Sequence, residues 1–144
     1  MNFIHPNATI SPTAKVWHFS VIHDFVILCD GVNIGSRVEL SDGCVIGRNS
    51  RIGSGVFLPP NSIVGQRVFI GPNTTFTDDK HPKVGNKNYK ADPPIIEDDA
   101  SIGAGCVVLP GVRIGKKAVI GAGSIVAKSV PDNAIVYGDY AKKR

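Results

Sequence analysis

The most regular feature of the chain is a six-residue spacing of apolar positions. From Ile4 to Phe76, every sixth residue is Ile, Val, Leu or Phe, thirteen times without exception. Because these four types make up under a third of the chain, an accidental run of this length has a probability of roughly 10⁻⁷. A period of six fits neither a helix nor an alternating strand. It predicts a prism in which each hexad supplies one short strand and one face of a coil.

A second register supports this interpretation. The position four residues after each large apolar residue is small or β-branched, as in Ala8, Ser20 and Val32, and we expect these side chains to point inward beside the large ones. The position directly after the large residue is often glycine, where the backbone turns or approaches a neighbour closely: Gly35, Gly47, Gly53, Gly65 and Gly71.

The hexad spacing stops after Phe76 and resumes in a new phase from Ile96 to Val126. The chain therefore divides into N-terminal coils (1–76), a loop that leaves the prism (77–95), C-terminal coils (96–130) and a tail (131–144). With three hexads per turn, the two runs predict six to seven coils of one all-β, parallel β-helix domain. Long loops on rigid scaffolds often carry function. The handedness of the coil is not readable from the period.

Composition adds limits on compartment and partners. No apolar stretch is long enough to span a bilayer, and the first residues lack the pattern of a leader peptide, so we expect a cytoplasmic protein. Two of its three cysteines, Cys44 and Cys106, fall in the inward small register, while Cys29 does not. We expect free thiols in a reducing compartment.

The net charge of +4 does not indicate nucleic-acid binding, because the basic residues are scattered without interleaved aromatics. Only Lys142-Lys143-Arg144 form a cluster. Two interpretations of that cluster remain open, a solvated tail and a contact with a phosphorylated small ligand.

The hexads resemble the left-handed parallel β-helix acyltransferases over nearly the whole chain. Within that superfamily, three segments look like the sugar-nucleotide 3-N-acetyltransferases: Val16–Ser20, Val68–Pro72 and Phe76–Asp79 followed by Pro82-Lys83. The segments from Ala100 to Gly105 and from Gly121 to Ser124 are similar to the acetyl-CoA half of the same enzymes. The resemblance implies a homotrimer with active sites between subunits and acetyl-CoA as co-substrate, without a metal. It implies acetylation of the 3-amino group of a nucleotide-linked deoxy sugar, with dTDP favoured over UDP.

Three positions depart from the family pattern. Asp78 stands where the family usually has Asn, Lys83 where it has Arg, and Gly138-Asp139-Tyr140-Ala141 where it has Gly-Asn-Pro-Ala. These departures bear on the sugar more than on the chemistry. The related 4-N-acetyltransferases use the same scaffold, so the position of the amine stays open.

The chemistry of acetyl transfer selects candidate residues in the loop. An attacking amine must be oriented and must lose a proton. His81 is the only histidine of the loop, and imidazole titrates near neutrality, so it is the candidate general base. Asp79 or Asp78 would orient it or hold the amine, and Lys83 is a further substrate-binding candidate. The family also allows the departing CoA sulfur to take the proton.

The thioester oxygen and the pantetheine arm need hydrogen-bond donors. Exposed N–H groups at prism corners supply them, which makes Gly103-Ala104 and Gly121-Ala122 the candidate cofactor corners. The turns require glycine there whether or not a ligand binds, so the structural interpretation remains open. Lys128, favoured by the resemblance, and Lys142 are the candidates to meet the CoA phosphates.

Two other classes of protein are alternatives. His18 and His23 are five residues apart, like two zinc ligands of the γ-class carbonic anhydrases, but the positions one and two coils further are Ser36, Ser41, Ser54 and Pro59, none of them zinc ligands. Subunit packing or substrate contact better suits both histidines. A non-catalytic hexapeptide scaffold is the remaining alternative, against which the long loop and the Gly-Ala corners argue. Outward apolar residues predict burial between subunits of a trimer: Val21, Phe25, Phe57 and Phe69.

Overall fold

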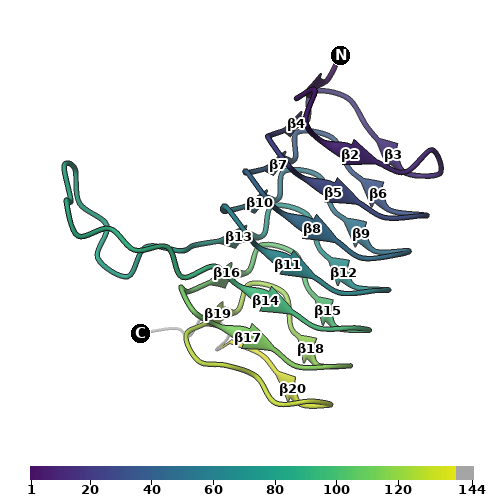
Figure 1. Cartoon of the computed structure of the whole chain (residues 1–144). Coiled ribbons are helices and arrows are strands. Elements are labelled where there is room, and N and C mark those ends of the chain that lie inside the picture. Colours follow the sequence, from purple (N-terminus) through teal and green to yellow (C-terminus); the bar gives the residue numbers. More distant parts are fainter. Residues whose placement is uncertain (139–144) are drawn as a thin grey trace.

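The chain coils into a three-sided prism of parallel strands, with no helix in the part of the chain that the structure describes (Figure 1). The structure is a computed structural model and describes residues 1–138. It has about seven turns and is the left-handed parallel β-helix that the sequence resemblance implies. Each turn, called a coil below, contributes one two-residue strand to each of three sheets, except that the last turn meets sheet B only through a bridge at Val130.

Sheet A contains β1 (Phe3–Ile4), β4 (Val21–Ile22), β7 (Glu39–Leu40), β10 (Phe57–Leu58), β13 (Thr75–Phe76), β16 (Val107–Val108) and β19 (Ile125–Val126). Sheet B contains β2 (Thr9–Ile10), β5 (Ile27–Leu28), β8 (Val45–Ile46), β11 (Ile63–Val64), β14 (Ile95–Ile96) and β17 (Arg113–Ile114). Sheet C contains β3 (Lys15–Val16), β6 (Asn33–Ile34), β9 (Arg51–Ile52), β12 (Phe69–Ile70), β15 (Ser101–Ile102), β18 (Val119–Ile120) and β20 (Ile135–Val136).

The second residue of most strands carries the large apolar side chain and points into the prism. Ile22, Ile52 and Phe76 are completely buried, whereas their strand neighbours face outward. The small register packs beside them, with Val26, Cys44 and other small residues also buried. Burial of one such large side chain contributes about 1.5–3 kcal/mol, so the hexad repeat accounts for the core.

The first hexads are less buried than their pattern predicts. Ile4 is still 42% exposed, and Ile10 and Val16 are only partly buried. Each of the first three strands pairs on one side only, with β4, β5 and β6. The end of a stack has no further coil to cover it, which explains the difference.

The strands are joined by three series of corners, and the B–C corners follow sheet B (residues 11–14, 29–32, 47–50, 65–68, 97–100 and 115–118). The A–B corners follow sheet A (residues 5–8, 23–26, 41–44, 59–62, 77–94, 109–112 and 127–129) and the C–A corners follow sheet C (17–20, 35–38, 53–56, 71–74, 103–106 and 121–124). Equivalent positions of successive coils are 18 residues apart, as in the hydrogen bond from the Val68 N–H to Ser50 Oγ.

The loop is an insertion at one A–B corner. Across it, the separation between equivalent positions grows to 32 residues, as in the hydrogen bond from the Gln66 N–H to Asp98 Oδ1. The strand pairing continues on both sides of the loop, with Val64 beside Ile96. The extra residues therefore leave the prism without displacing the next coil.

The coil continues further than the sequence pattern indicates. Residues 131–144 were predicted as a tail, but β20 pairs with β18 and brings Val136 beside Ile120. Val130 is four residues after Val126, which predicts a place in the small register, but it bridges Ile114 of the large register. Here the separation between coils falls to 16 residues, as in the hydrogen bond from the Lys116 N–H to Asp132 Oδ1. The last A–B corner is thus shorter than the others, so the six-residue step fails there while the stacking of coils persists.

Candidate functional site

The inserted loop leaves the prism after β13 and is anchored at its base. Thr77 donates from both its N–H and its hydroxyl to the carbonyl oxygen of Val108, at 3.0 and 2.9 Å. The N–H of Asp92 donates to the Asp78 carbonyl, and the N–H of Gly111 donates to the Asp92 carbonyl, both at 2.9 Å. The two ends of the loop are therefore tied to one another and to the next coil, and Figure 1 shows the loop projecting from the prism.

Asp78 and Asp79 stand at the start of the loop and make different contacts. Asp78 Oδ2 accepts a hydrogen bond of 2.5 Å from the Tyr89 hydroxyl. That bond is the main reason why the pKa of Tyr89 rises to about 12, because the phenol is held protonated beside a carboxylate. Asp79 Oδ1 accepts a 2.8 Å hydrogen bond from the backbone N–H of His81. Asp79 thus fixes the backbone at His81 and leaves the imidazole ring unengaged.

His81 lies on an exposed hollow of the loop. The hollow has a volume of about 310 Å³ and its other lining residues come from both limbs of the loop: Asp79, Lys80, Asn86, Asn88, Lys90, Ala91 and Asp92. Lys80 Nζ forms an ion pair with Asp92 Oδ2 at 2.7 Å, and Asn86 Nδ2 donates to the His81 carbonyl at 3.2 Å. Within residues 1–138, neither predicted carboxylate bonds to the imidazole, and the hydrogen bonds of His81 come from its backbone N–H and carbonyl.

A larger groove of about 470 Å³ lies where the loop base meets sheet A. Its prism side is apolar and its loop side is polar, and it is lined by Phe57, Thr75, Phe76, Thr77, Asp78, Asp79, Lys80, Pro82, Leu109 and Pro110. Asp79 and Lys80 line both this groove and the hollow beside His81. We call the two together the loop site. Lys83, predicted as a substrate contact, is exposed on the loop and lines neither cavity.

The predicted cofactor corners are stacked directly on each other at the C–A corner of successive coils. The N–H of Gly123 donates to the Ala104 carbonyl at 2.8 Å. A Cβ on Gly103 would lie 2.4 Å from the backbone nitrogen of Ala122, and one on Gly121 would lie 2.7 Å from the Cβ of Tyr137. Both glycines are therefore required by the stacking itself, independent of any ligand.

What distinguishes these corners is the alanine at each. At the other corners, a side-chain oxygen of the next coil often accepts from the corner N–H, as Ser54 Oγ does from Ser36 and Asp98 Oδ1 from Gln66. At position 104 the residue below is Ala122, which has no such oxygen. Among residues 1–138, no acceptor contacts the N–H groups of these two exposed alanines. They are open donors, suited to an amide or thioester oxygen.

Lys128 lies at the last A–B corner and not beside the Gly-Ala corners. It lines a hollow of about 330 Å³ at the C-terminal end of the prism, together with Tyr137 and neighbouring residues. Lys142 lies outside the described residues, as do the other two residues of the basic cluster.

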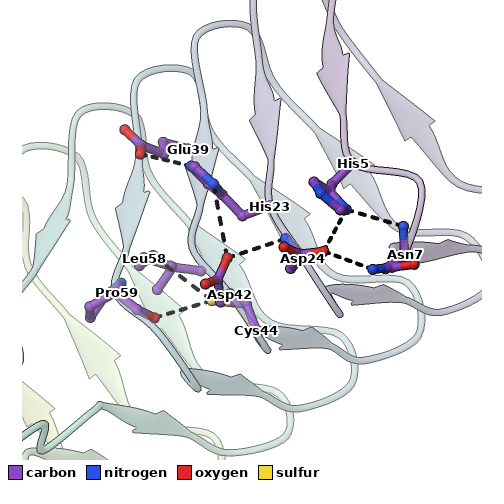
Figure 2. A network of polar contacts seen from close by, with 9 residues as sticks. All are labelled: His5, Asn7, His23, Asp24, Glu39, Asp42, Cys44, Leu58 and Pro59. Carbon is purple, nitrogen blue, oxygen red and sulfur yellow. Dashed lines mark hydrogen bonds and ion pairs between the residues drawn. The ribbon is translucent and has the colours of Figure 1, made fainter.

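His18 and His23 are placed at two different corners near the N-terminal end. His18 is at a C–A corner, 3.4 Å from the terminal amine through Nδ1. His23 is at an A–B corner, where Nε2 contacts Glu39 at 3.1 Å and Nδ1 lies 4.0 Å from Asp42 (Figure 2). His5 forms a similar pair with Asp24, 2.5 Å apart, one coil above (Figure 2).

The two histidines are also remote from the loop site along the prism. His23 follows β4 and the loop follows β13, three strand spacings further in sheet A, which is about 14 Å. The structure therefore does not bring His18 and His23 together, nor either of them to His81 within one chain. Within the described part of the chain, no three His, Cys, Asp or Glu side chains are grouped as metal ligands.

Sequence reasoning missed Lys80 and Asp92, which line the loop site, and Tyr89, which bonds to Asp78 beside it. Tyr89 and Asp92 contact Asp78 from the returning limb of the loop, and no local motif links them to it. The available signal was only that the loop is long and rich in charged and amide residues. No helix capable of crossing a bilayer is present between Met1 and Gly138.

Comparison with known proteins gives the family. Residues 43–78 and 93–128, together half of the chain, match the family described as bacterial transferase hexapeptide (six repeats), and residues 26–59 match the hexapeptide repeat of succinyl-transferase. The two matches to the first family lie on either side of the loop, since one ends at residue 78 and the other begins at residue 93. The family signature is thus carried by the prism.

Curated relatives match over short stretches. A galactoside O-acetyltransferase of Lactococcus lactis is 60% identical over 43 residues, which are 30% of this chain and 21% of the relative. A 2,3,4,5-tetrahydropyridine-2,6-dicarboxylate N-acetyltransferase of Staphylococcus aureus is 56% identical over 52 residues, 36% of this chain and 22% of the relative. The matched part spans about a fifth of the length of these relatives.

Among solved structures, a hexapeptide-repeat acetyltransferase from Vibrio cholerae, complexed with acetyl coenzyme A, is similar in fold. It superposes with a TM-score of 0.61 and 28% identity, covering 75% of this chain and 66% of that one. From the repeat profile and the coil geometry, the chain belongs to the bacterial hexapeptide-repeat transferase family.

Proposed function

We propose that this protein is an acetyl-CoA-dependent acetyltransferase whose acceptor is the amino group, in first place the 3-amino group, of a nucleotide-linked deoxy sugar. The observation that carries the proposal is the loop site, where His81 and two carboxylates adjoin a groove on an otherwise regular prism. Family membership and the acetyl-CoA complex of the Vibrio cholerae relative support the acetyl donor.

The proposed reaction uses groups that the chain supplies. The neutral amine of the sugar attacks the thioester carbonyl carbon, an N–C bond forms, and the C–S bond breaks to release CoA. The proton lost by nitrogen passes to His81 Nδ1 or Nε2, or directly to the departing sulfur. The open N–H groups of Ala104 and Ala122 stabilise the oxyanion or hold the pantetheine amides.

Asp78 and Asp79 suit an amine acceptor. A carboxylate beside the groove attracts an ammonium group before it loses its proton, and such a charge-assisted hydrogen bond is stronger than a neutral one. Both carboxylates line the groove, and the only cation among its lining residues is Lys80, which is paired with Asp92. An alcohol acceptor would gain less from these two negative charges.

The functional groups are divided between two edges of sheet A, which supports a shared site in a homotrimer. The loop adjoins the A–B corner at Gly111, whereas Ala104 is at the C–A corner of the same coil. The stretch from Ala104 to Pro110 spans at most about 20 Å. A second copy that places its C–A corner beside this loop would complete the site. Phe25 is 65% and Phe69 43% exposed, which also suits burial between copies.

A subunit-mixing experiment tests this arrangement. Two variants, His81→Asn and Ala104→Pro, are each expected to lose activity, and trimers reassembled from both should regain part of it, because some interfaces then carry both intact groups. Light scattering of the unmodified protein should give the mass of a trimer. A monomeric mass would contradict the shared site.

The acceptor is tested by incubation with acetyl-CoA and matched sugars. The panel contains dTDP- and UDP-linked 3-amino and 4-amino deoxy sugars, and CoA release is measured with mass detection of the product. We expect the dTDP-linked 3-amino sugar to react fastest. Faster reaction of a 4-amino sugar would show that the acceptor is the 4-amino group. Complete silence together with no CoA binding would favour a non-catalytic scaffold.

A second candidate is O-acetylation of a sugar hydroxyl. The 60% identity to a stretch of the galactoside O-acetyltransferase favours it. Adding galactosides to the same panel separates the two candidates.

The free thiols suit a reducing compartment, and we place the reaction in the cytoplasm.

A further inference from the structure

A separate hollow of about 260 Å³ lies on sheet C near the N-terminal end, three coils from the Gly-Ala corners. It is lined by residues of three successive coils: Trp17, Asn33, Gly35, Ser36, Arg51, Ile52, Gly53 and Ser54. None of them is acidic, which distinguishes this hollow from the loop site with its Asp79 and Asp92. Nothing in the loop chemistry uses these residues.

Trp17 lines one part of this hollow, and glycines occupy the equivalent corner position in the next two coils. Trp17, Gly35 and Gly53 each follow the second residue of their strand, β3, β6 and β9, and so stack on one another. The two glycines place no side chain under the indole, and each stacks closely on the backbone of the next coil. The indole Nε1 donates to Asn33 Oδ1 at 2.9 Å, which fixes the ring against the coil below while half of its surface stays exposed. A planar ligand ring can stack on such a face.

Arg51 supplies a positive charge that no carboxylate of the described residues neutralises. It stands in register between Asn33 and Phe69 on the outer face of sheet C. Arg67 and Arg113 pair with Asp99 and Glu97 at 2.7 and 2.5 Å, whereas no carboxylate of residues 1–138 lies within ion-pair distance of Arg51. A guanidinium in this state matches the paired oxygens of a phosphate.

Ser36 and Ser54 add polar groups to the lining of the hollow. The N–H of Ser36 donates to Ser54 Oγ at 3.2 Å, so that hydroxyl keeps its own proton to donate to a ligand. The hollow thus combines an exposed indole face, an unpaired guanidinium and a hydroxyl donor.

We infer that the hollow formed by Trp17, Arg51 and Ser54 binds a nucleoside diphosphate, with the base on the indole and the phosphates on Arg51 and Ser54. This inference rests on the proposed function, because a nucleotide-linked acceptor is what would bring such a group to the protein. The volume admits a base and a phosphate but not a whole nucleotide sugar. The sugar therefore extends out of the hollow.

Two molecules of the proposed reaction contain a diphosphate with a nucleoside, the sugar nucleotide and CoA. The position of the hollow favours the sugar nucleotide. The Gly-Ala corners lie on the coils of β15 and β18, three to four strand spacings from β6 in sheet C, about 14 to 19 Å. Lys128, the candidate contact of the CoA phosphates, lies beyond those corners at the C-terminal end of the prism, so a CoA bound to Lys128 extends away from this hollow.

The chain carries its own probe, because Trp17 is its only tryptophan. Titration of the unmodified protein with dTDP, UDP, ADP and CoA, followed by Trp17 fluorescence and by calorimetry, should show quenching by dTDP or UDP. Arg51→Gln should weaken this binding by about tenfold or more, because a charge-assisted hydrogen bond is lost. Arg48→Gln makes the same change of charge on a nearby exposed arginine that does not line the hollow, and should change affinity by less than about twofold.

The outcomes separate this inference from the proposed function. Arg51-dependent binding of dTDP or UDP without acetyl transfer supports the hollow and contradicts the proposed reaction. Acetyl transfer with an unchanged KM for the sugar nucleotide in Arg51→Gln overturns the hollow and leaves the reaction intact. Quenching by CoA and ADP alone would also overturn the assignment to the sugar nucleotide. Circular dichroism of each variant verifies that it is folded.

Discussion

The hydroxyl of Tyr89 donates to Asp78 Oδ2 at 2.5 Å and so joins the returning limb of the inserted loop to its first residues. The bond spans 11 residues and lies beside the groove that Asp78 also lines. Tyr89 is therefore a closing residue of the loop. Asp78, one of the residues at which the chain departs from the family pattern, is engaged through Oδ2 by its own loop while it also lines the groove.

Replacing Tyr89 with Phe should loosen the loop without unfolding the prism. The phenol is half exposed, so the loss of global stability should stay below about 1 kcal/mol. Tryptic cleavage at Lys83, Lys87 or Lys90 should become faster, measured against Tyr137→Phe, which changes a tyrosine outside the loop. Equal cleavage rates in the two variants would show that the bond does not hold the loop.

The same bond has a signature in pH. Because the pKa of Tyr89 in the folded protein is raised to about 12, its contribution is complete below about pH 10 and is lost as the pH rises through 12. Tyrosinate absorbance of the unmodified protein should contain a component with a midpoint near 12. That component should be missing from Tyr89→Phe and should disappear when the protein is unfolded.

Replacing His81 with Asn should lower kcat by about 10²-fold or more if the imidazole takes the proton, since positioned bases supply about 10²–10⁴. The matched control is Lys83→Gln, a change two residues away on the same exposed loop but outside both cavities. A fall of less than about tenfold would leave the proton to the CoA sulfur.

Replacing Ala104 with Pro removes one open N–H and little else. Pro72 occupies the equivalent corner one coil above, and Gly105 donates to its carbonyl at 2.9 Å, so the corner accepts proline. Acetyl-CoA affinity or turnover should fall by about tenfold, the value of one hydrogen bond. The melting temperature should stay within about 2 °C of the unmodified protein. Unchanged kinetics would remove this corner from the cofactor site.

Burial of Cys44 makes stability sensitive to alkaline pH. Desolvation raises the pKa of its thiol to about 11 from a usual 9.0, against hydrogen bonds from Ser62 that lower it. The folded form then retains a proton that the unfolded chain releases, so stability is complete below about pH 9 and falls by about 2–3 kcal/mol toward pH 11.

Denaturant unfolding at several pH values measures this fall. Cys44→Val is the matched variant, because Val26 fills the same place one coil earlier and is also buried. The variant should lose less stability than the unmodified protein as the pH rises through this range. An identical fall in both would assign it to other groups.

The fold was predictable because each hexad repeats one local rule, and the buried positions Ile22 to Phe76 follow it without exception. The rule failed where the spacing changed without a change in stacking. The last A–B corner is shorter than the others. A fixed period of six therefore could not predict β20 or the pairing of Val130 with Ile114.

The site was less predictable for a different reason. The loop, His81 and the Gly-Ala corners could be chosen by residue type, and the structure places them on opposite edges of sheet A. The pairing of Asp78 with Tyr89, and of Asp79 with the backbone of His81 in place of its ring, depends on how the loop closes on itself. No periodicity constrains that closure.

The inserted loop leaves the strands on either side in full register, Ile63 with Ile95 and Val64 with Ile96. The loop is thus attached at a single corner, and the coils before and after it stack in the same register as coils without an insertion. A loop of another length or sequence could be exchanged at this corner without redesign of the coils. Under the proposed function, replacement of this one contiguous segment would change the acceptor while the coils that stabilise the protein stay the same.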